Sequence, residues 1–579
     1  MACIVGAPGD NSAMRFFRPR CCFVVAALWT GCLLGMPALA QTALPDRLPD
    51  RPIDWPMDAP PDALPDAVLQ ALRRAELPAD ALAAVALPVR QPGLAWPSQR
   101  WGYQPERLMQ PGSTMKLVAS VVALDRLGPN LRGFTELRSA APVQNGVLQG
   151  ELVLKGGADT DLSIAAFWAL LLELREQGVH TVQGDLVVDR SHWHPARLDV
   201  GLPPFDDAPE WPYNVIPDAL QLAGNLLPIT LRSNAQSLQV GSVPTLDGLQ
   251  ISHAMTLIDA PCRDWDDGWQ SAALTRQGAQ TRIELRGTFP RNCSARAELQ
   301  LIDRLELAER LFRTLWRQLG GQWPGAAREA VGPVDSRLLV RRQGRPWGEV
   351  LRPLNKNSDN ALTRMLYLNL GVPTPPGLPG QSAPAASAAS AAPTARTAPT
   401  APTAPASPAT QGSSAPAANA RPTAELAAQA VNQWFAQHGI DPTGLVMDNG
   451  SGLSRSERIS PLQLARMLQV AHAAPYAADL MMSLPTAGVD GTMRNRLKQG
   501  PAAGWARLKT GTLRNVVALA GYVPDPQGQL WAVALMINHE RANRGRPVLD
   551  ALVNHWATQG MVGQPDVAPG TVGPLGEGP

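Results

Sequence analysis

Lysine is scarce in this chain of 579 residues, and the few lysines are therefore candidates for chemistry. Of the 51 Lys and Arg residues, only five are lysines. Arginine keeps its proton under nearly all conditions, whereas a desolvated lysine can lose its proton and act as a base. A chain so biased toward arginine is expected to keep lysine where a guanidinium group cannot serve. The five positions are Lys116, Lys155, Lys356, Lys498 and Lys509.

The first candidate is Ser113-Thr114-Met115-Lys116, where the sequence predicts the opening of a helix. Positions i and i+3 share a helix face, so the ammonium nitrogen of Lys116 can reach the hydroxyl of Ser113. A serine hydroxyl is a weak nucleophile and needs an adjacent base. Lysine can supply that base when burial and nearby positive charge lower its pKa from about 10.4. The alternative is an exposed helix that carries an incidental serine and lysine.

The second candidate is Lys509-Thr510-Gly511-Thr512, which precedes two apolar runs separated by a turn, Val516–Val523 and Trp531–Ile537. This pattern predicts a hairpin. At the rim of a cleft, such a strand offers an ammonium group and hydroxyls to a carboxylate, and its glycine lets a substrate backbone lie close. The alternative is an edge strand with a solvated lysine.

The third candidate is Ser358-Asp359-Asn360, directly before a predicted helix over residues 361–366. Lys356 lies two residues before Ser358. Taken alone, this tripeptide is equally consistent with a helix cap.

Together the motifs occur in the order S-x-x-K, S-x-N and K-T-G, the signature of class A β-lactamases and penicillin-binding proteins. Ser113 and Ser358 are 245 residues apart, which is too far for a simple β-lactamase. The long intervening segment resembles the D-alanyl-D-alanine carboxypeptidase/endopeptidase family, the class C low-molecular-mass penicillin-binding proteins. Other stretches that resemble this family are residues 111–117, 448–455, 484–492 and 518–522.

The resemblance implies an α/β (α+β) chain with a penicillin-binding/β-lactamase-like serine transpeptidase fold, in which β-rich domains are inserted between the S-x-x-K and S-x-N motifs. It implies that Ser113 attacks the carbonyl between two terminal D-alanines and that Lys116 takes its proton. Backbone N–H groups of Ser113 and Thr512 would form the oxyanion hole. Asp490 and Arg494 lie in a family-like segment, but the sequence assigns them no chemical role.

The same resemblance gives roles to the remaining motif residues. Ser358 would relay a proton to the leaving amine, and Asn360 would hold the substrate amide and the Lys116 side chain. The terminal carboxylate, or that of a β-lactam, would bind at Lys509, Thr510 and Thr512, beside Gly511.

No cofactor and no metal are expected. His192 and His194 flank Trp193 without further ligands nearby in the sequence, which favours a structural or exposed pair. The expected partners are peptidoglycan stem peptides and cross-links, β-lactam antibiotics, and a weak association with the membrane or the wall machinery. A net charge of only +2, without a basic stripe, argues against nucleic acid.

The first forty residues read as a signal peptide, with a basic start, an apolar run and an Ala38-Leu39-Ala40 cleavage site. We expect cleavage after Ala40 and a periplasmic location. The alternative is a membrane anchor that the mature protein retains. The sequence does not decide whether translation starts at Met1 or at Met14.

The expected domain organisation has the penicillin-binding domain split in two by the inserted β-rich domains. In chain order we expect a signal peptide (1–40), a flexible lead-in (41–65), the first section of the penicillin-binding domain (66–138), the inserted β-rich domains (139–330), the second section of the penicillin-binding domain (331–560) with a disordered Ala/Pro/Ser/Thr insertion (373–422), and a flexible tail (561–579).

The mature chain would keep two cysteines, Cys262 and Cys293. An exported protein meets an oxidising environment, so these two are expected to form a disulfide. The alternative is a pair of unpaired buried thiols.

Two other functions remain open at this point: a β-lactamase or esterase on the same fold, and a non-catalytic wall-binding or β-lactam-sensing module. The long insertion argues against the first, and the three intact motifs argue against the second. The preference for carboxypeptidase or endopeptidase cleavage, the diamino acid of the stem peptide, the oligomeric state and the role of residues 373–422 stay undetermined by the sequence.

Overall fold

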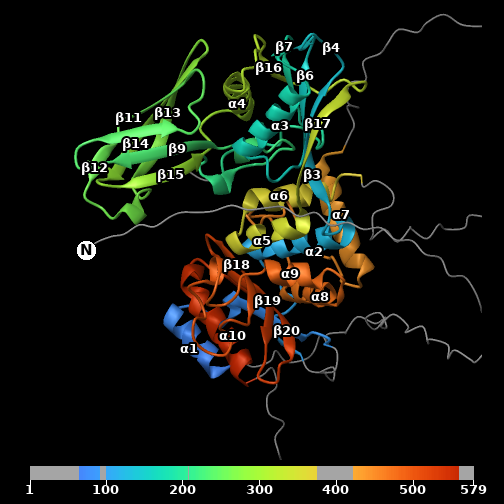
Figure 1. The fold of residues 1–579 in the computed structure, drawn as a ribbon. Helices are drawn as coiled ribbons and strands as arrows, with labels where there is room; N and C mark the ends of the chain where they lie inside the picture. Colours follow the sequence, from blue (N-terminus) through green and yellow to red (C-terminus); the bar gives the residue numbers. More distant parts are fainter. Residues whose placement is uncertain (1–63, 92–99, 206–207, 374–420, 560–579) are drawn as a thin grey trace, which may run out of the picture. The chain divides into compact units, whose positions relative to one another are not determined.

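The structure, a computed structural model, describes residues 64–91, 100–205, 208–373 and 421–559 (Figure 1). The expected signal peptide (1–40), nearly all of the lead-in (41–65), nearly all of the Ala/Pro/Ser/Thr insertion (373–422) and the tail (561–579) lie outside the described residues.

One five-stranded antiparallel sheet carries the K-T-G motif at its edge. Its strand order is β18 (Arg507–Leu513), β19 (Val516–Pro524), β20 (Leu530–Asn538), β1 (Leu82–Pro88) and β2 (Trp101–Tyr103). The predicted hairpin is confirmed as β19 and β20, and the early strand β1 pairs with β20. The sheet thus joins the two ends of the described chain.

Helices cover both faces of this sheet, as Figure 1 shows for α1 (Asp66–Ala75) and α10 (Arg546–Gln559) on one side and α8 (Pro461–Ala473) on the other. Successive side chains of a strand point to opposite faces. Leu82, Ala84 and Ala86 of β1 accordingly belong to the core that contains α10. Their neighbours in the strand belong to the core that contains α2 (Lys116–Leu127).

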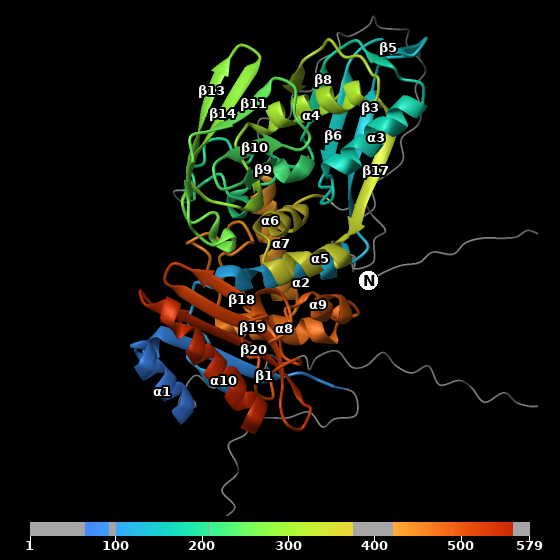
Figure 2. The same cartoon turned by 60° about the vertical axis from the view of Figure 1, so that its left-hand side comes forward.

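Ser113 lies on a short 3-10 turn (Gly112–Met115) that runs directly into α2. Ten of the twelve residues of α2 are buried, so this is a central helix instead of an exposed one. It contacts four other helices (Figure 2): α5 (Trp347–Asn357), α6 (Asn360–Asn369), α7 (Thr423–Gln437) and α8. A short helix, α9 (Ala477–Ser483), packs on α5 and α8. Among the described residues, no helix combines the length and the apolar character that crossing a membrane requires.

A second sheet lies in the segment between Ser113 and Ser358. Its order is β16 (Ala327–Glu329), β8 (Leu186–Asp189), β6 (Leu152–Gly157), β3 (Arg132–Ser139) and β17 (Arg337–Pro346). β3 and β17 pair antiparallel. β3 spans the expected domain boundary at 138/139, and β17 lies after the expected boundary at 330/331. The chain thus enters this sheet on β3 and leaves it on the neighbouring strand β17.

Three smaller sheets complete this segment. Their strands are β4 (Val143–Gln144), β5 (Val147–Leu148) and β7 (Thr181–Val182); β9 (Leu227–Ser233), β10 (Leu238–Ser242) and β15 (Ser294–Leu299); and β11 (Leu249–His253), β12 (Thr256–Ile258), β13 (Trp269–Gln277) and β14 (Gln280–Pro290). A disulfide joins Cys262 to Cys293, with Cα atoms 5.3 Å apart.

Two helices pack in the core of this segment, which was expected to be β-rich. One of them is α4 (Arg304–Gln318), which is capped by Asp303, whose Oδ1 accepts a hydrogen bond from Leu305 N at 2.7 Å. The other helix, α3 (Ile164–Glu176), lies in a stretch that was expected to be β-rich. It was missed because apolar residues occur all along it, so that a helical period is hard to see.

A buried carboxylate, Asp218, fixes the loop that reaches toward the S-x-N motif. Its Oδ2 accepts hydrogen bonds from Arg190 Nε at 3.0 Å and Arg304 Nη1 at 2.7 Å. Arg304 also donates to the carbonyl of Ile216 at 3.0 Å. The same loop presents the carbonyl of Tyr213 to Asn360 Nδ2 at 2.8 Å. The inserted segment is therefore tied to the S-x-N motif through a buried charge network.

Replacing Asp218 by asparagine tests this network. The amide keeps the shape but leaves two buried guanidinium groups without their shared charge, which is expected to cost about 3 kcal/mol of unfolding free energy. Urea unfolding followed by circular dichroism measures the loss. The exposed Asp335→Asn variant is the control. Equal midpoints for the two variants would contradict the role given to Asp218.

Candidate active site

The nitrogen of Lys116 is surrounded by neutral acceptors. Lys116 is fully buried, and its Nζ donates to Ser113 Oγ at 3.0 Å and to Asn360 Oδ1 at 2.7 Å. It also donates to the carbonyl oxygen of Ser451. The S-x-x-K and S-x-N motifs thus meet at one ammonium group.

Burial turns the Lys116 side chain into a base that can be neutral near pH 7. Desolvation lowers the pKa of Lys116 to about 7, although Glu457 and Asp359 pull it in the other direction. Burial, followed by the charge of Lys116, also holds the pKa of Lys509 well below its usual range. Within the described ranges, neither lysine has a carboxylate oxygen within 4.0 Å, whereas Lys155 pairs with Asp189 and Lys356 with Asp490.

The S-x-N motif forms the corner between α5 and α6. Ser358 ends α5 in the left-handed region, at φ 59°, and Asp359 caps α6 by accepting from Leu362 N at 2.8 Å. The helix-capping alternative therefore applies to Asp359 alone. Ser358 and Asn360 contact the two buried lysines, because Lys509 Nζ donates to Ser358 Oγ at 2.8 Å and Lys116 donates to Asn360.

The K-T-G strand β18 lies directly against the turn that carries Ser113. A Cβ atom placed on Gly511 would lie 2.5 Å from the carbonyl oxygen of Pro111 and 3.2 Å from Ser113 N. A Cβ atom on Gly112 would likewise lie 3.2 Å from Thr512 N. The amides of Ser113 and Thr512 therefore border the same narrow space, and only glycine at position 511 permits this approach. Two neighbouring N–H groups that point to one oxygen can stabilise an oxyanion.

The loop at residues 448–455 closes over the nucleophile, a role that the sequence did not assign. Gly452 has φ 79°, and a Cβ atom there would lie 2.0 Å from the carbonyl oxygen of Gly112 and 2.8 Å from Ser113 N. The preceding residue, Ser451, supplies the carbonyl that contacts Lys116. The loop thus holds both the nucleophile and its base.

Glu457 anchors this loop. Its Oε1 accepts from the backbone N–H of Asn449 at 3.2 Å and of Gly450 at 2.9 Å, and its Oε2 is buried without a partner among the described residues. Burial raises the pKa of Glu457 to about 7. The sequence carries no signal for this residue, since Glu457 stands between the charged residues of an ordinary polar loop.

Asp490, to which the sequence assigned no role, links the end of α5 to the segment that precedes Thr492. Its Oδ2 pairs with Lys356 Nζ at 2.6 Å, and its Oδ1 accepts from Thr486 N at 2.9 Å. Burial acts to raise the pKa of Asp490, but the hydrogen bond from Lys356 holds it below its usual value. Two residues later, Thr492 Oγ1 accepts from Thr510 Oγ1 at 2.8 Å. Arg494 is exposed and lies after this contact.

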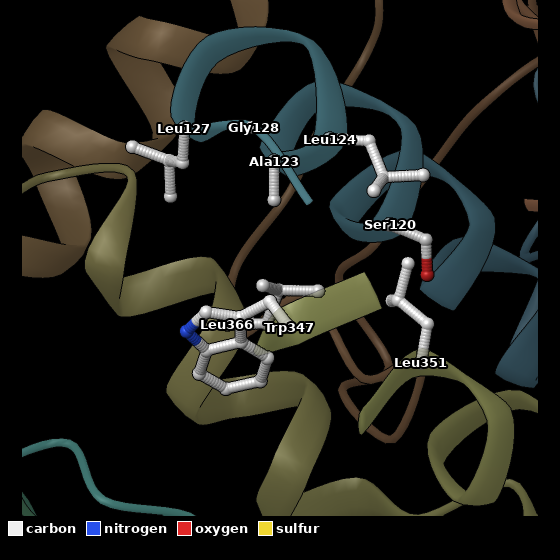
Figure 3. A pocket seen from close by; sticks show the side chains of 8 residues that line it. All are labelled: Ser120, Ala123, Leu124, Leu127, Gly128, Trp347, Leu351 and Leu366. Atoms are coloured by element: carbon white, nitrogen blue, oxygen red, sulfur yellow. The ribbon is translucent and has the colours of Figure 1, made fainter. Parts of the chain in front are cut away.

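Apolar side chains pack α2 against α5 and α6. Figure 3 shows Leu124 and Leu127 of α2 facing Trp347 and Leu351 of α5, and this cluster leaves no space that a water molecule could occupy. A rigid backing of this kind keeps Ser113 and Lys116 in register with α5 and α6.

The histidines 192 and 194 make hydrogen bonds within the protein. His192 Nε2 lies 3.2 Å from Asn369 Oδ1, and the backbone N–H of His194 donates to Thr423 Oγ1 at 2.8 Å. In the part of the chain that the structure describes, no three His, Cys, Asp or Glu side chains gather as a metal site would require.

Comparisons with known proteins show the family and the fold of this chain. A family model described as the D-Ala-D-Ala carboxypeptidase 3 (S13) family matches residues 73–392 and 413–559. The D-alanyl-D-alanine carboxypeptidase of Actinomadura sp. (strain R39) is 27% identical over 459 residues, 76% of this chain and 76% of that protein. The D-alanyl-D-alanine carboxypeptidase DacB of Haemophilus influenzae is 24% identical over 444 residues, 75% of this chain and 82% of the relative.

The crystal structure of penicillin binding protein 4 (dacB) from Haemophilus influenzae resembles this fold with a TM-score of 0.63 at 20% identity, covering 85% of this chain and 99% of that one. A structure of the same protein complexed with a novel β-lactam gives a TM-score of 0.59 at 21% identity, covering 82% and 95%. The expected penicillin-binding fold is thereby confirmed.

The pH dependence of the reaction with benzylpenicillin tests the role of the buried lysine. Below its pKa, Lys116 is protonated and cannot accept the proton, so the rate constant for acylation by benzylpenicillin is expected to fall about tenfold per pH unit below about pH 7 and to level off above it. Stopped-flow measurement over about pH 5 to 9 is the assay, since that range spans the expected pKa.

Glu457→Gln provides the contrast. The amide oxygen can still accept from Asn449 and Gly450, but the negative charge that Glu457 carries above its own pKa of about 7, and that favours protonated Lys116, is gone. The midpoint of the plot of the acylation rate constant against pH should therefore move to lower pH, by about half a unit. The exposed Glu176→Gln variant should keep the original midpoint. A Glu457→Gln midpoint that stays in place or rises would refute the coupling.

Proposed function

Because the chain belongs to the D-Ala-D-Ala carboxypeptidase 3 (S13) family, we propose that it cleaves the peptides of bacterial peptidoglycan through an acyl-enzyme on Ser113. The observation that carries this proposal is the 3.0 Å contact between Ser113 Oγ and a buried lysine without a carboxylate partner among the described residues. A serine and a base in hydrogen-bond contact, with the base oriented by a third group, is the arrangement that nucleophilic catalysis needs.

In the first step, Ser113 Oγ attacks the carbonyl carbon of the bond between the last two D-alanines, and neutral Lys116 takes the hydroxyl proton. Asn360 Oδ1, at 2.7 Å, orients the lysine nitrogen for this transfer. The negative charge that develops on the carbonyl oxygen is held by the N–H groups of Ser113 and Thr512. Such preorganised donors are worth about 3 kcal/mol of transition-state stabilisation each.

In the second step the C–N bond breaks, and the leaving amine needs a proton. Ser358 would pass it from Lys116, because its hydroxyl is held by Lys509 Nζ at 2.8 Å beside the same cleft. The departing D-alanine leaves an ester on Ser113. Water then attacks this ester, with Lys116 again acting as the base, and the shortened peptide is released.

The terminal carboxylate of the substrate would bind at Lys509, Thr510 and Thr512. Lys509 is buried without an ion pair among the described residues, so a bound carboxylate would supply the negative charge that its surroundings lack. Electrostatic attraction of this kind is strong where water is excluded. It would favour peptides with a free carboxyl end.

A β-lactam presents a strained amide and a carboxylate in the same relative positions, so we expect it to acylate Ser113. The solved relative complexed with a novel β-lactam supports this expectation. Export to the periplasm fits the disulfide between Cys262 and Cys293, since oxidising compartments favour such bonds. The predicted signal peptide, cleaved after Ala40, would direct that export.

Release of D-alanine from a stem pentapeptide tests this function. The Ser113→Ala variant should lose at least about a thousandfold in rate, because the nucleophile is gone. Lys116→Arg should lose a similar factor, since a guanidinium group cannot accept the proton. The exposed Ser191→Ala variant should match the wild type. Persistent release by the Ser113→Ala protein would exclude the proposed acyl-enzyme.

A further inference from the structure

The hydrogen bond between the inserted segment and the S-x-N motif has no role in the chemistry above. Asn360 Nδ2 donates to the backbone carbonyl of Tyr213 at 2.8 Å. Tyr213 belongs to a short 3-10 turn (Pro212–Asn214) and precedes Asn360 by 147 residues. On its other side, the same amide accepts from Lys116 Nζ through Oδ1 at 2.7 Å. The Asn360 amide therefore lies between a backbone acceptor and the catalytic base.

Contacts within the inserted segment hold this turn at both ends. Before the turn, the ring of Trp211 lies 6.1 Å from that of Trp265 and 5.9 Å from that of Trp269, measured between centroids. The buried Glu210 accepts from Trp269 Nε1 at 3.2 Å. After the turn, Asp218 binds two buried guanidinium groups. The position of the Tyr213 carbonyl is thus set by the inserted segment, independently of Asn360.

The hydrogen bonds of Lys116 show what a fixed amide does for the base. A neutral lysine nitrogen has two N–H donors and one lone pair. Among the described residues, three polar groups contact Lys116 Nζ, and two of them, Asn360 Oδ1 and the carbonyl of Ser451, can only accept. They take both N–H groups of the neutral amine. The lone pair is left for the hydroxyl of Ser113, 3.0 Å away, which is the arrangement that proton transfer needs.

This arrangement depends on which way the Asn360 amide points. An asparagine amide that turns over exchanges its acceptor oxygen for an NH₂ donor. A protonated Lys116 offers only donors and would hold Oδ1 in place by itself. A neutral Lys116 also accepts, so a flipped amide could donate from Nδ2 to its lone pair and block the transfer from Ser113. The carbonyl of Tyr213 can only accept, and it therefore opposes the flipped form when the lysine is neutral.

We propose that the carbonyl of Tyr213 is a positioning group that fixes the Asn360 amide, so that neutral Lys116 keeps its lone pair for the nucleophile. The second hydrogen on Nδ2 stays available to the substrate amide. The inference rests on the proposed function and gives the inserted segment a part in catalysis.

Asn214→Pro tests this role, because a backbone carbonyl cannot be removed by substitution but can be turned. Proline disfavours the helical backbone of the residue before it, here Tyr213. It also removes the N–H group of residue 214, which donates to the carbonyl of Trp211 at 2.9 Å. Asn214→Ala is the matched control, because it keeps that N–H group and loses only the side chain, which donates to the carbonyl of Ala208.

The measurement is the rate constant for acylation by benzylpenicillin, plotted against pH. Asn214→Pro should lower the rate constant about tenfold on the high-pH plateau, because a misdirected base transfers the proton poorly. The midpoint should move to lower pH, since a flipped amide stabilises the neutral lysine. Asn214→Ala should match the wild type in both respects. Pro212→Gly loosens the turn without breaking it and should change both in the same direction by less.

The direction of the midpoint separates positioning from a loosened structure. Water admitted to Lys116 would favour the ammonium form and move the midpoint to higher pH. The charges that act on Lys116 come from Glu457, Asp359 and Arg364, which all of these variants keep. A shift to lower pH therefore reports a change in the hydrogen bonds of the lysine.

A double-mutant cycle shows whether the turn acts through Asn360. Asn360→Ala removes the amide, so adding Asn214→Pro to it should cause no further loss of rate, whereas independent effects would multiply. Multiplying losses, a midpoint at higher pH, or an Asn214→Pro protein that matches Asn214→Ala would overturn the role of Tyr213 and leave the proposed function standing. If Asn214→Pro does not fold, as judged by circular dichroism, a wild-type profile for Pro212→Gly would overturn it. A wild-type protein that is not acylated at Ser113 would remove both.

Discussion

Two lysine side chains, Lys116 and Lys509, are buried in the active site without a carboxylate to pair with among the described residues. Burying an ammonium group is unfavourable, and burial accordingly lowers the pKa of both lysines, that of Lys116 to about 7. What surrounds them is a set of neutral acceptors: a serine hydroxyl, an asparagine oxygen and backbone carbonyls. An ion pair at either position would keep its lysine charged. Lys116 could then not act as a base, and Lys509 would have no affinity left for a substrate carboxylate.

The packing around the site keeps water away from the two buried lysines. Lys116 opens a helix that is buried along most of its length, and four other helices contact that helix. β18 is held at the edge of a sheet whose two faces are covered. Gly452 and Gly511 allow two backbone segments to approach Ser113 more closely than any side chain would permit, and Gly112 allows the close approach of Thr512 N. A site that depends on desolvation needs such close contact, because water between the segments would hydrate the ammonium group and favour its charged form.

Much of the site was predictable because most of its reactive residues belong to three short sequence motifs. Ser113 and Lys116 lie one helical turn apart, and the family resemblance that the ordered motifs carry implied that Ser358, Asn360 and Lys509 share one cleft. The loop at Ser451 was not predictable in the same way, since its contact with Lys116 spans 335 residues and uses a backbone carbonyl that any residue possesses. Glu457 was missed for a similar reason, because only the fold distinguishes a buried carboxylate from its exposed neighbours. In the fold, α3 escaped prediction because its apolar residues lack a clear period, and the pairing of β3 with β17 depends on long-range contacts.

The central claim, that Ser113 is the residue that becomes acylated, is tested most directly by mass spectrometry of the mature protein after incubation with benzylpenicillin. Intact mass gives the number of adducts, and peptide mapping gives the position. Turnover of the drug without a lasting adduct would favour a β-lactamase, and neither adduct nor turnover would favour a binding module. We expect a single stable adduct on the peptide that contains Ser113, absent from the Ser113→Ala protein. An adduct on another residue, or one that persists in the variant, would contradict the claim.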